Sequence, residues 1–255
     1  MNRQVRTAAG NDFVLDLNDS AINSHFEAKS SYADFILQQI NSGIYSELLV
    51  GRDLVVVDMG ANIGLFSIYA HDVAKSVYSI ESTPSHFDLL TRISKPILNI
   101  HPVNIAIAPI DGHLPFCVSK TNSTMNNADK RRAGSEEIYV KGVSLQTFID
   151  NLQLERIDFI KCDIEGGEMS VLSNQTIQAT SNVIGKWYIE VHSLRGSRLS
   201  EQWTDFVLYK CRLGKFVYSA HMRNLARNRE ILADRFKMAG YQVKLLGSDT
   251  LIAFK

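Results

Sequence analysis

The 255-residue chain has few cysteines, no long apolar run and no net charge, and each shortage excludes a class of protein. Three scattered cysteines, Cys117, Cys162 and Cys211, are too few for a disulfide framework or a zinc site, which fits the reducing cytoplasm. The first residues lack the hydrophobic core of a signal peptide, and no apolar run approaches the length that crosses a bilayer. We therefore expect a cytoplasmic protein without a membrane partner.

The balance of charge limits the partners of the chain. Lys and Arg number 27, as do Asp and Glu, so no overall field draws the protein to nucleic acid, and only local patches could do so. With 45% hydrophobic residues, the chain can bury the core of one catalytic domain. We expect that domain to span residues 51–255, preceded by an N-terminal cover segment with a helix over residues 1–50.

The most informative stretch is an apolar run, residues 54–57, that leads directly into Asp58, Gly60 and Gly64. The run predicts a buried parallel strand, and the two glycines allow the backbone to turn sharply before a helix begins near Ile63. Ligands of open α/β sheets bind at the carboxyl ends of the strands. The stretch therefore predicts a loop that binds a nucleotide-like cofactor.

This loop lacks the third glycine of a dinucleotide fingerprint, because its two glycines are four residues apart. The pyrophosphate cradle is incomplete, and the negative charge of Asp58 suits a cationic amino acid group better than a phosphate. S-adenosylmethionine carries such a group and is the cofactor that we expect. The loop residues predicted to bind it are Asp58, Gly60, Asn62, Ile63 and Gly64.

A second acid supports this interpretation. Residues 76–80 read as a strand that ends in Glu81, at the distance from the glycine loop where a carboxylate binds both ribose hydroxyls. The alternative is that Glu81 caps the helix that starts near Pro84, although the serines and threonine around that proline are better caps. We therefore expect Glu81 to bind the cofactor ribose.

The rest of the chain alternates strand and helix, as a doubly wound sheet requires. A third strand near residues 103–108 places Asn104 and Ala106 near the adenine edge. The polar interval 119–137 is either a hairpin loop or a mobile lid. In the N-terminal segment, a helical face formed by Tyr32, Phe35, Ile36 and Ile40 predicts a helix that stops at Gly43 and covers the cofactor end of the sheet.

A charged strand lies in the middle of the chain. Residues 157–164 have strand character and are followed by two glycines and a predicted helix from Glu168 to about Ile177. Alternation places Lys161, Asp163 and Glu165 on one face. Because unpaired buried charge is costly, these residues form either a structural ion pair or a functional carboxylate cluster.

The following strand, residues 183–191, brings two more polar residues to the same edge of the sheet. Glu190 and His192 point to one side of that strand by the same alternation. The acids of the two strands and the histidine can therefore converge.

Four stretches together resemble the FkbM-type S-adenosylmethionine-dependent methyltransferases, over roughly residues 50–193. They are residues 58–64, Glu81, the phrase at residues 157–168 and residues 189–192. The resemblance implies an α/β fold, the Rossmann-like doubly wound sheet of class I methyltransferases, with seven strands of which the last is antiparallel. It also implies methyl transfer that is mostly directed at oxygen. Residues 241–246 and 250–254 fit the closing hairpin of that fold.

Methyl transfer requires the acceptor oxygen, methyl carbon and sulfur in line, and a group that removes the acceptor proton. We expect His192, with a pKa near neutrality, to be the general base and Glu190 to orient it. A histidine that merely hydrogen-bonds at the strand end is the alternative. Asp163 could instead accept the proton, or join Glu190 and His192 around a cation such as Mg²⁺, the less favoured arrangement because its ligands have no fixed spacing.

The absence of two sequence motifs excludes two classes of methyl acceptor. The chain has no Asp/Asn-Pro-Pro-aromatic loop of base-amine methyltransferases, since Asp163 to Gly166 occupies that position, and no cysteine that follows proline as in cytosine-C5 enzymes. We expect the acceptor to be a hydroxyl of a sugar, polyketide or related small molecule. Two further classes of protein stay open, a catalytically silent cofactor-binding module and a nicotinamide-dependent oxidoreductase.

A basic C-terminal region keeps an anionic acceptor, such as an RNA ribose, as an alternative to a solvated helix face. The expected helix spans about residues 222–238. The basic residues of this region are Lys210, Arg212, Lys215, Arg223, Arg227, Arg229, Arg235 and Lys237, and the local acids are Glu230 and Asp234.

Overall fold

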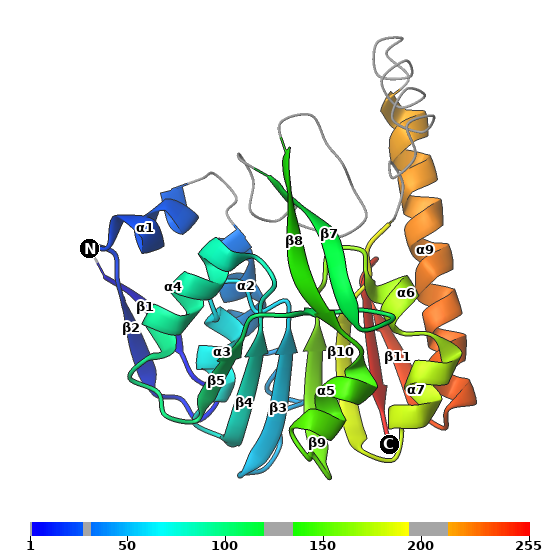
Figure 1. Ribbon diagram of the computed structural model, residues 1–255, viewed down its shortest axis with the longest axis horizontal. Coiled ribbons are helices and arrows are strands. Elements are labelled where there is room, and N and C mark those ends of the chain that lie inside the picture. The colour runs from blue at the N-terminus through cyan, green and yellow to red at the C-terminus, as the bar shows by residue number, and fades with distance from the viewer. Residues whose placement is uncertain (1, 28–31, 120–134, 194–213) are drawn as a thin grey trace.

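A seven-stranded sheet forms the centre of the computed structural model, which describes residues 2–27, 32–119, 135–193 and 214–255 (Figure 1). The strand order is β11-β12-β10-β9-β3-β4-β5. Strand β12 runs antiparallel to both of its neighbours, and the other paired strands run parallel. The predicted doubly wound sheet of seven strands with an antiparallel last strand is confirmed.

The strands of this sheet are short and mostly buried. Their bounds are β3 Leu54–Met59, β4 Ala74–Ile80, β5 Ile100–Val103, β9 Ile157–Cys162, β10 Ile184–Glu190, β11 Gln242–Leu246 and β12 Thr250–Phe254. The connecting helices are α3 Leu65–Ala70, α4 Pro84–Ser94, α5 Leu145–Asn151, α6 Glu168–Val171, α7 Asn174–Thr180 and α9 Gly214–Met238.

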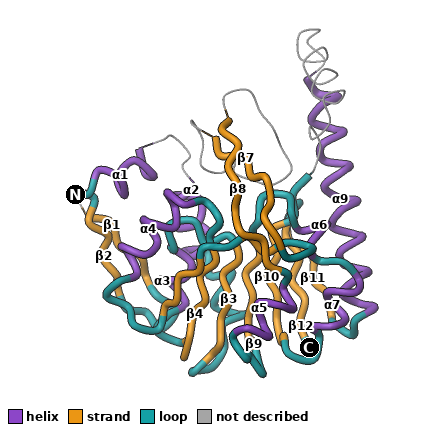
Figure 2. The backbone as a smooth tube through the Cα atoms, in the orientation of Figure 1, coloured by secondary structure: helices purple, strands orange, loops and turns teal. Residues whose placement is uncertain are grey.

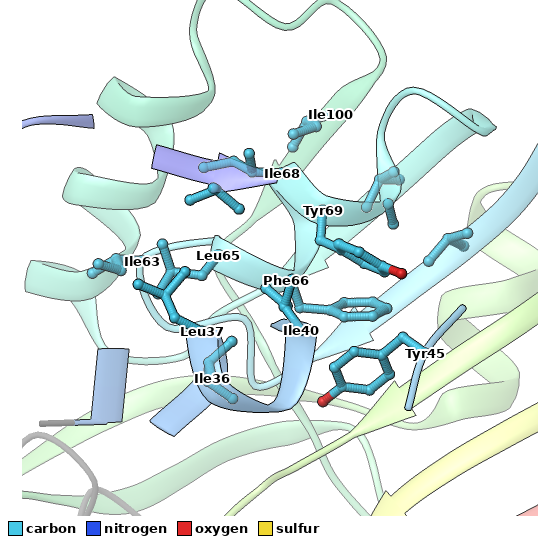
Figure 3. Close-up of a cluster of buried hydrophobic side chains, with 14 of the residues drawn as sticks. Ile36, Leu37, Ile40, Tyr45, Ile63, Leu65, Phe66, Ile68, Tyr69 and Ile100 are labelled. Atoms are coloured by element: carbon cyan, nitrogen blue, oxygen red, sulfur yellow. The ribbon is translucent and has the colours of Figure 1, made fainter. Parts of the chain in front are cut away.

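Two hydrophobic clusters form because neighbouring residues of a buried strand point to opposite faces. Val56 of β3 belongs to the cluster of the N-terminal elements, α3 and α4, whereas Val57 belongs to the cluster of α5, α7 and α9. Trp187 and Tyr188 divide between the two clusters in the same way. Figure 3 shows part of the first cluster, in which Tyr45 packs edge-on against Phe66 at 4.8 Å between ring centroids.

The N-terminal segment packs on the face of the sheet that also carries α3 and α4. It contains a hairpin of β1 Asn2–Arg6 and β2 Asp12–Asp16, then α1 Ser20–Glu27 and α2 Tyr32–Asn41. Ala33, Ile36, Leu37 and Ile40 form the buried face of α2. The prediction that Phe35 belongs to this face is wrong, since its side chain is 42% exposed. The domain boundary near residue 50 stays a prediction.

A separate antiparallel hairpin rises above the sheet (Figure 1). It consists of β7 Gly112–Ser119 and β8 Ser135–Val143, and the short β6 Ala106–Ile107 pairs with β8. The alternative between a loop and a lid concerns residues 120–134, which lie outside the described residues. The predicted third strand at residues 103–108 is wrong in its bounds, because β5 ends at Val103 and β6 joins the hairpin instead.

Two predicted helices are shorter than expected. The helix after the glycine loop, for which the sequence predicts an end at about Ala74, ends at Ala70, and the helix predicted from Glu168 to Ile177 is divided into α6 and α7. The division occurs at Ser173, whose hydroxyl accepts a hydrogen bond from the backbone N–H of Thr176 and so begins a new helix. Within the described residues, no helix is long and apolar enough to span a membrane.

Candidate active site

A cavity of about 350 Å³ lies where β3, β4 and β9 end, with the loops of these strands beneath hairpin β7–β8 (Figure 2). Leu114 and Phe116 of the hairpin contribute to its apolar wall. Glu81, Asp163 and Glu165 contribute carboxylates to the lining. The cavity is therefore at the edge of the sheet where the sequence predicted the cofactor.

The glycine loop forms one wall of this cavity through Gly60 and Asn62. Gly60 has φ +83°, and a Cβ at this position would overlap the carbonyl oxygen of Asp163. Gly64 has φ +88°, and a Cβ there would lie 2.5 Å from Cδ1 of Leu90 in α4. Both glycines are thus required by the close approach of neighbouring backbone and side chain, in addition to any contact with a ligand.

Asp58 lies beneath the loop, outside the described lining of the large cavity. Its Oδ2 accepts a 2.7 Å hydrogen bond from the hydroxyl of Ser67 in α3. Burial raises the pKa of Asp58, while Lys161 and Ser67 oppose the shift. With Ile63, Asp58 lines a separate cavity of about 10 Å³, so the structure gives both residues a place in supporting the loop. Their direct contact with a cofactor stays a prediction.

Glu81 is almost fully buried and faces the large cavity. Oε2 accepts the backbone N–H of Asn62 at 2.9 Å, and Oε1 accepts that of Thr83 at 2.7 Å. The Thr83 side chain also hydrogen-bonds this carboxylate, so three of its about four lone pairs are engaged and the remaining capacity is available to a ribose hydroxyl. Thr83 is the N-cap of α4, so Glu81 also supports the start of that helix.

The two residues predicted near the adenine edge have different positions. Ala106 lines the cavity, whereas Asn104 is exposed and donates its side-chain amide to the backbone carbonyl of Glu81 at 2.8 Å. Asn104 therefore stabilises the turn that carries Glu81.

The charges of β9 include a structural ion pair. Lys161 Nζ lies 3.1 Å from Asp163 Oδ2, and each side chain is 1% exposed. Of the two alternatives for these charges, the structure shows the ion pair for Lys161. Asp163 also lines the large cavity, so the pair does not exclude a functional contact for that carboxylate.

His192 lies at the carboxyl end of β10, among three carboxylates. Its Nδ1 is 3.0 Å from Glu168 Oε1, and its Nε2 is 3.8 Å from both Asp163 Oδ1 and Glu165 Oε2. Burial by itself lowers the pKa of His192, but Glu168, Asp163 and Glu165 outweigh it and raise the pKa to about 10. The three carboxyl groups therefore favour the protonated imidazole, in contrast to the near-neutral pKa that was predicted for His192.

Glu190 does not orient His192, because Glu168 makes the contact that was predicted for it. Glu190 instead accepts a 3.4 Å hydrogen bond from the Gln39 side chain of α2. Burial, followed by the charge of Asp163, raises the pKa of Glu190 to about 7. Glu168 was missed from the sequence because strand alternation places no residue beyond the two glycines that follow β9.

One further arrangement could hold a divalent cation. Ligand atoms of Asp163, Glu165 and His192 lie within 4.8 Å of one another. Glu165 thus takes the place predicted for Glu190 in this set. Burial and the charge of Asp163 raise the pKa of Glu165 to about 8.

The charge of the large cavity distinguishes between cofactors. Carboxylates of Glu81, Asp163 and Glu165 line it, and among the residues described there no lysine or arginine does so. His86 also lines it, but burial and the nearby His25 lower the pKa of His86 to about 4, so this side chain is neutral. Although burial raises the pKa of Glu165, an approaching ammonium or sulfonium group lowers it again and favours the carboxylate, so this wall of carboxyl groups complements S-adenosylmethionine and opposes a pyrophosphate.

The strand order and the acidic cavity define a class I S-adenosylmethionine-dependent methyltransferase. Residues 58–227, well over half of the chain, match the methyltransferase FkbM domain. The chain therefore belongs to the FkbM methyltransferase family, as the resemblance implied.

Individual relatives are distant. Methyltransferase sdnD of Sordaria araneosa is 26% identical over 185 residues, which cover 58% of this chain and 71% of the relative. Hexuronic acid methyltransferase AglP of Haloferax volcanii is 24% identical over 145 residues, covering 56% of this chain and 57% of the relative. The crystal structure of methyltransferase FkbM from Methylobacillus flagellatus KT shares 18% identity and a TM-score of 0.43, and the match covers 82% of this chain and 46% of that one.

Proposed function

We propose that this methyltransferase transfers the methyl group of S-adenosylmethionine to a hydroxyl of a sugar, polyketide or related small molecule. The observation that carries the proposal is one cavity lined by Glu81 and by the carboxylates of Asp163 and Glu165. Glu81 keeps capacity for a ribose hydroxyl, and the other two carboxyl groups complement the positive charges of the cofactor.

The chemistry assigns a role to His192. When bound, S-adenosylmethionine supplies an electrophilic methyl carbon, and its transfer to oxygen leaves a neutral thioether. His192 is not among the described residues that line the cavity, but its Nε2 lies 3.8 Å from two carboxyl groups that do, those of Asp163 and Glu165, and from there it accepts the proton of the acceptor hydroxyl. The positive charge of S-adenosylmethionine, bound near these carboxylates, would weaken their stabilisation of the protonated His192 ring. It would therefore favour the neutral imidazole, which can act as the base.

Two observations favour a small-molecule acceptor over RNA. Arg229 donates to the carbonyl of Gly247, and Arg235 donates to two carbonyls of the α6–α7 region, so these cations of α9 stabilise the fold itself. Lys210 and Arg212 lie outside the described residues, as does the side chain of Lys215. The Haloferax volcanii relative is named for a sugar acid, which supports a sugar hydroxyl as the first class of acceptor to test.

The test is a screen of hydroxylated sugars, polyketides and short RNAs with labelled S-adenosylmethionine, in which mass spectrometry locates the added group. A sugar or polyketide product supports the proposal, and a product on RNA alone replaces it. Cofactor binding without transfer to any acceptor indicates a catalytically silent module.

The role of His192 is tested by substitution. His192→Ala is expected to lower turnover by roughly 10²–10⁴-fold, the usual contribution of positioned proton transfer, with nearly unchanged cofactor affinity by calorimetry. His101→Ala, at an exposed histidine of β5, is the matched control. Full activity of His192→Ala would leave alignment and Asp163 as the account of catalysis.

A divalent cation at Asp163, Glu165 and His192 is the second mechanism, favoured by their grouping. Such a cation would acidify the acceptor hydroxyl directly. A chelator should then abolish activity and added Mg²⁺ or Mn²⁺ restore it, whereas a chelator-resistant enzyme retains His192 as the base.

A further inference from the structure

Glu168 is a fully buried acid for which the spacing of the sequence predicts no role. It is the first residue of α6, and it is 0% exposed. One oxygen, Oε1, lies 3.0 Å from His192 Nδ1 and also accepts the backbone N–H groups of Ile164 at 3.2 Å and Gly166 at 3.1 Å. A single carboxylate oxygen therefore links the histidine to the loop that carries Asp163 and Glu165.

This contact determines which ring nitrogen of His192 lies near the cavity-lining carboxyl groups. Because Glu168 occupies Nδ1, Nε2 points toward Asp163 and Glu165, both of which line the cavity. The His192 side chain remains 24% exposed, and its backbone carbonyl accepts a 3.0 Å hydrogen bond from Asn228 of α9. The backbone and one ring nitrogen are thus held, while the other nitrogen is left for an acceptor hydroxyl.

Anchoring of the loop does not by itself explain a charged side chain here. The two backbone N–H groups require only an acceptor oxygen, which a glutamine amide would also offer. A buried carboxylate carries a desolvation cost that only a charge partner or several hydrogen bonds can offset. Oε2 has no hydrogen-bond partner among the described residues, and the imidazole of His192 is the charge partner that contacts Oε1.

We propose that Glu168 is the positioning residue of His192, holding a proton on Nδ1 so that Nε2 of the neutral ring is the base that faces the acceptor. This inference rests on the proposed function of His192. The other charged groups around the ring are Asp163 and Glu165 after β9 and Glu190 of β10, Lys161 of β9 is paired with Asp163, and the described part of α9 contributes the neutral Asn228. Of these groups, Glu168 lies closest to Nδ1 in the contacts that the structure describes.

The first experiment measures the ring nitrogens of His192 by ¹⁵N NMR in the full-length native protein without cofactor. The resonances are assigned by their loss in His192→Ala. The spectra are followed as the pH is raised through the pKa of the ring, about 10, and we expect the neutral ring to keep its proton on a hydrogen-bonded Nδ1. A neutral ring that carries its proton on Nε2 would overturn the proposal, and this result requires no variant of Glu168 to fold.

The second experiment is a double-mutant cycle on turnover. Glu168→Gln is expected to lower turnover by no more than the roughly 10²–10⁴-fold lost with His192, and to have no further effect in the His192→Ala background. Glu155→Gln, at an exposed acid before β9, removes the same charge elsewhere and is expected to leave turnover unchanged. An equal loss from Glu168→Gln in both backgrounds would show that Glu168 acts on the loop alone and would reject the positioning role.

The two experiments also distinguish this inference from the proposed function. A protein that transfers no methyl group to any acceptor contradicts the proposed function. The NMR result would still show whether Glu168 holds a proton on Nδ1 of His192. Active protein with the Nε2–H tautomer contradicts only the role of Glu168.

Discussion

At the scale of single residues, Glu81 is the clearest test of cofactor binding. Its carboxylate is held by two backbone N–H groups and faces the cavity, so Glu81→Ala removes the predicted ribose contact. Binding of S-adenosylmethionine, measured by isothermal titration calorimetry, is expected to weaken by about 1.5–3 kcal/mol, the scale of hydrogen bonds to a charged group. Glu155→Ala is the exposed control, and equal affinities of the two variants would contradict the assignment of Glu81.

His86 gives the protein a predictable sensitivity to acid. Its pKa falls from 6.5 to about 4 on folding, because the ring is buried and lies near His25. The unfolded chain therefore binds a proton at a higher pH than the folded protein does. Stability is lost as the pH falls from about 6.5 to 4, and the loss is complete below the folded pKa.

Between pH 7 and pH 5, this single group is expected to lower the free energy of unfolding by about 2 kcal/mol, since one pKa unit corresponds to about 1.4 kcal/mol. Urea unfolding of the native protein and of His86→Gln at both pH values measures the effect. The variant should lose correspondingly less stability on acidification, and His101→Gln should behave as the native protein. Identical pH dependence of all three proteins would show that His86 titrates normally.

The site could be predicted from the sequence only where a strand determines the position of a side chain. The carboxylates of Glu81 and Asp163 lie at the ends of β4 and β9, and both were expected at the cavity that they line. Glu168 follows two glycines, so no periodicity connects it to His192. The pKa of His192 depends on carboxylates that reach it from the loop after β9 and from α6, and this convergence exists only in the folded chain.

At the scale of elements, α9 stabilises the break between α6 and α7. Arg235 Nη1 donates to the carbonyls of Met169 and Leu172, each at 2.8 Å, and so binds two of the carbonyls left without partners at the end of α6. Arg235→Met is expected to destabilise the protein by roughly 1.5–3 kcal/mol, the scale of hydrogen bonds from a charged donor.

Thermal or urea unfolding measures this loss. The control is Lys237→Met, at an exposed residue of α9 whose contact is an i,i+3 ion pair with Asp234, for which a change within about 0.5 kcal/mol is expected. If both variants unfold alike, the two carbonyl contacts of Arg235 do not stabilise the break.

The bounds of helices and strands were predicted well where apolar runs are long. They were predicted poorly where strand pairing or helix capping determines them. Strands β3, β9 and β10 agree with their apolar runs. Strand β6 exists only through its pairing with β8, and the division of α6 from α7 depends on the cap at Ser173. Phe35 fits a helical face by spacing, but packing against α3 selects the face that contains Ile36 and Ile40 instead.

At the scale of the whole molecule, the sheet brings residues from distant parts of the chain to one acidic edge. The resemblance to the FkbM family implied seven strands with an antiparallel last strand, but the strand order became visible only in the structure, because crossover connections cannot be read from local patterns. The consequence is a cavity whose charge selects a cationic cofactor. The cytoplasmic location of the protein and the identity of its methyl acceptor stay predictions.

This selection predicts which cofactor stabilises the protein against heat. A ligand at 100 times its dissociation constant stabilises the folded state by about 2.7 kcal/mol, and for a chain of this size 1 kcal/mol raises the Tm by about 2–4 °C. S-adenosylmethionine at that concentration is therefore expected to raise the Tm by roughly 5–10 °C in differential scanning fluorimetry. At the same concentration, S-adenosylhomocysteine, which lacks the sulfonium charge, should raise it less. NAD⁺ should leave it unchanged, because its pyrophosphate meets Glu81, Asp163 and Glu165 without a lysine or arginine among the described lining residues. A shift with NAD⁺ and none with S-adenosylmethionine would instead support a nicotinamide-dependent oxidoreductase.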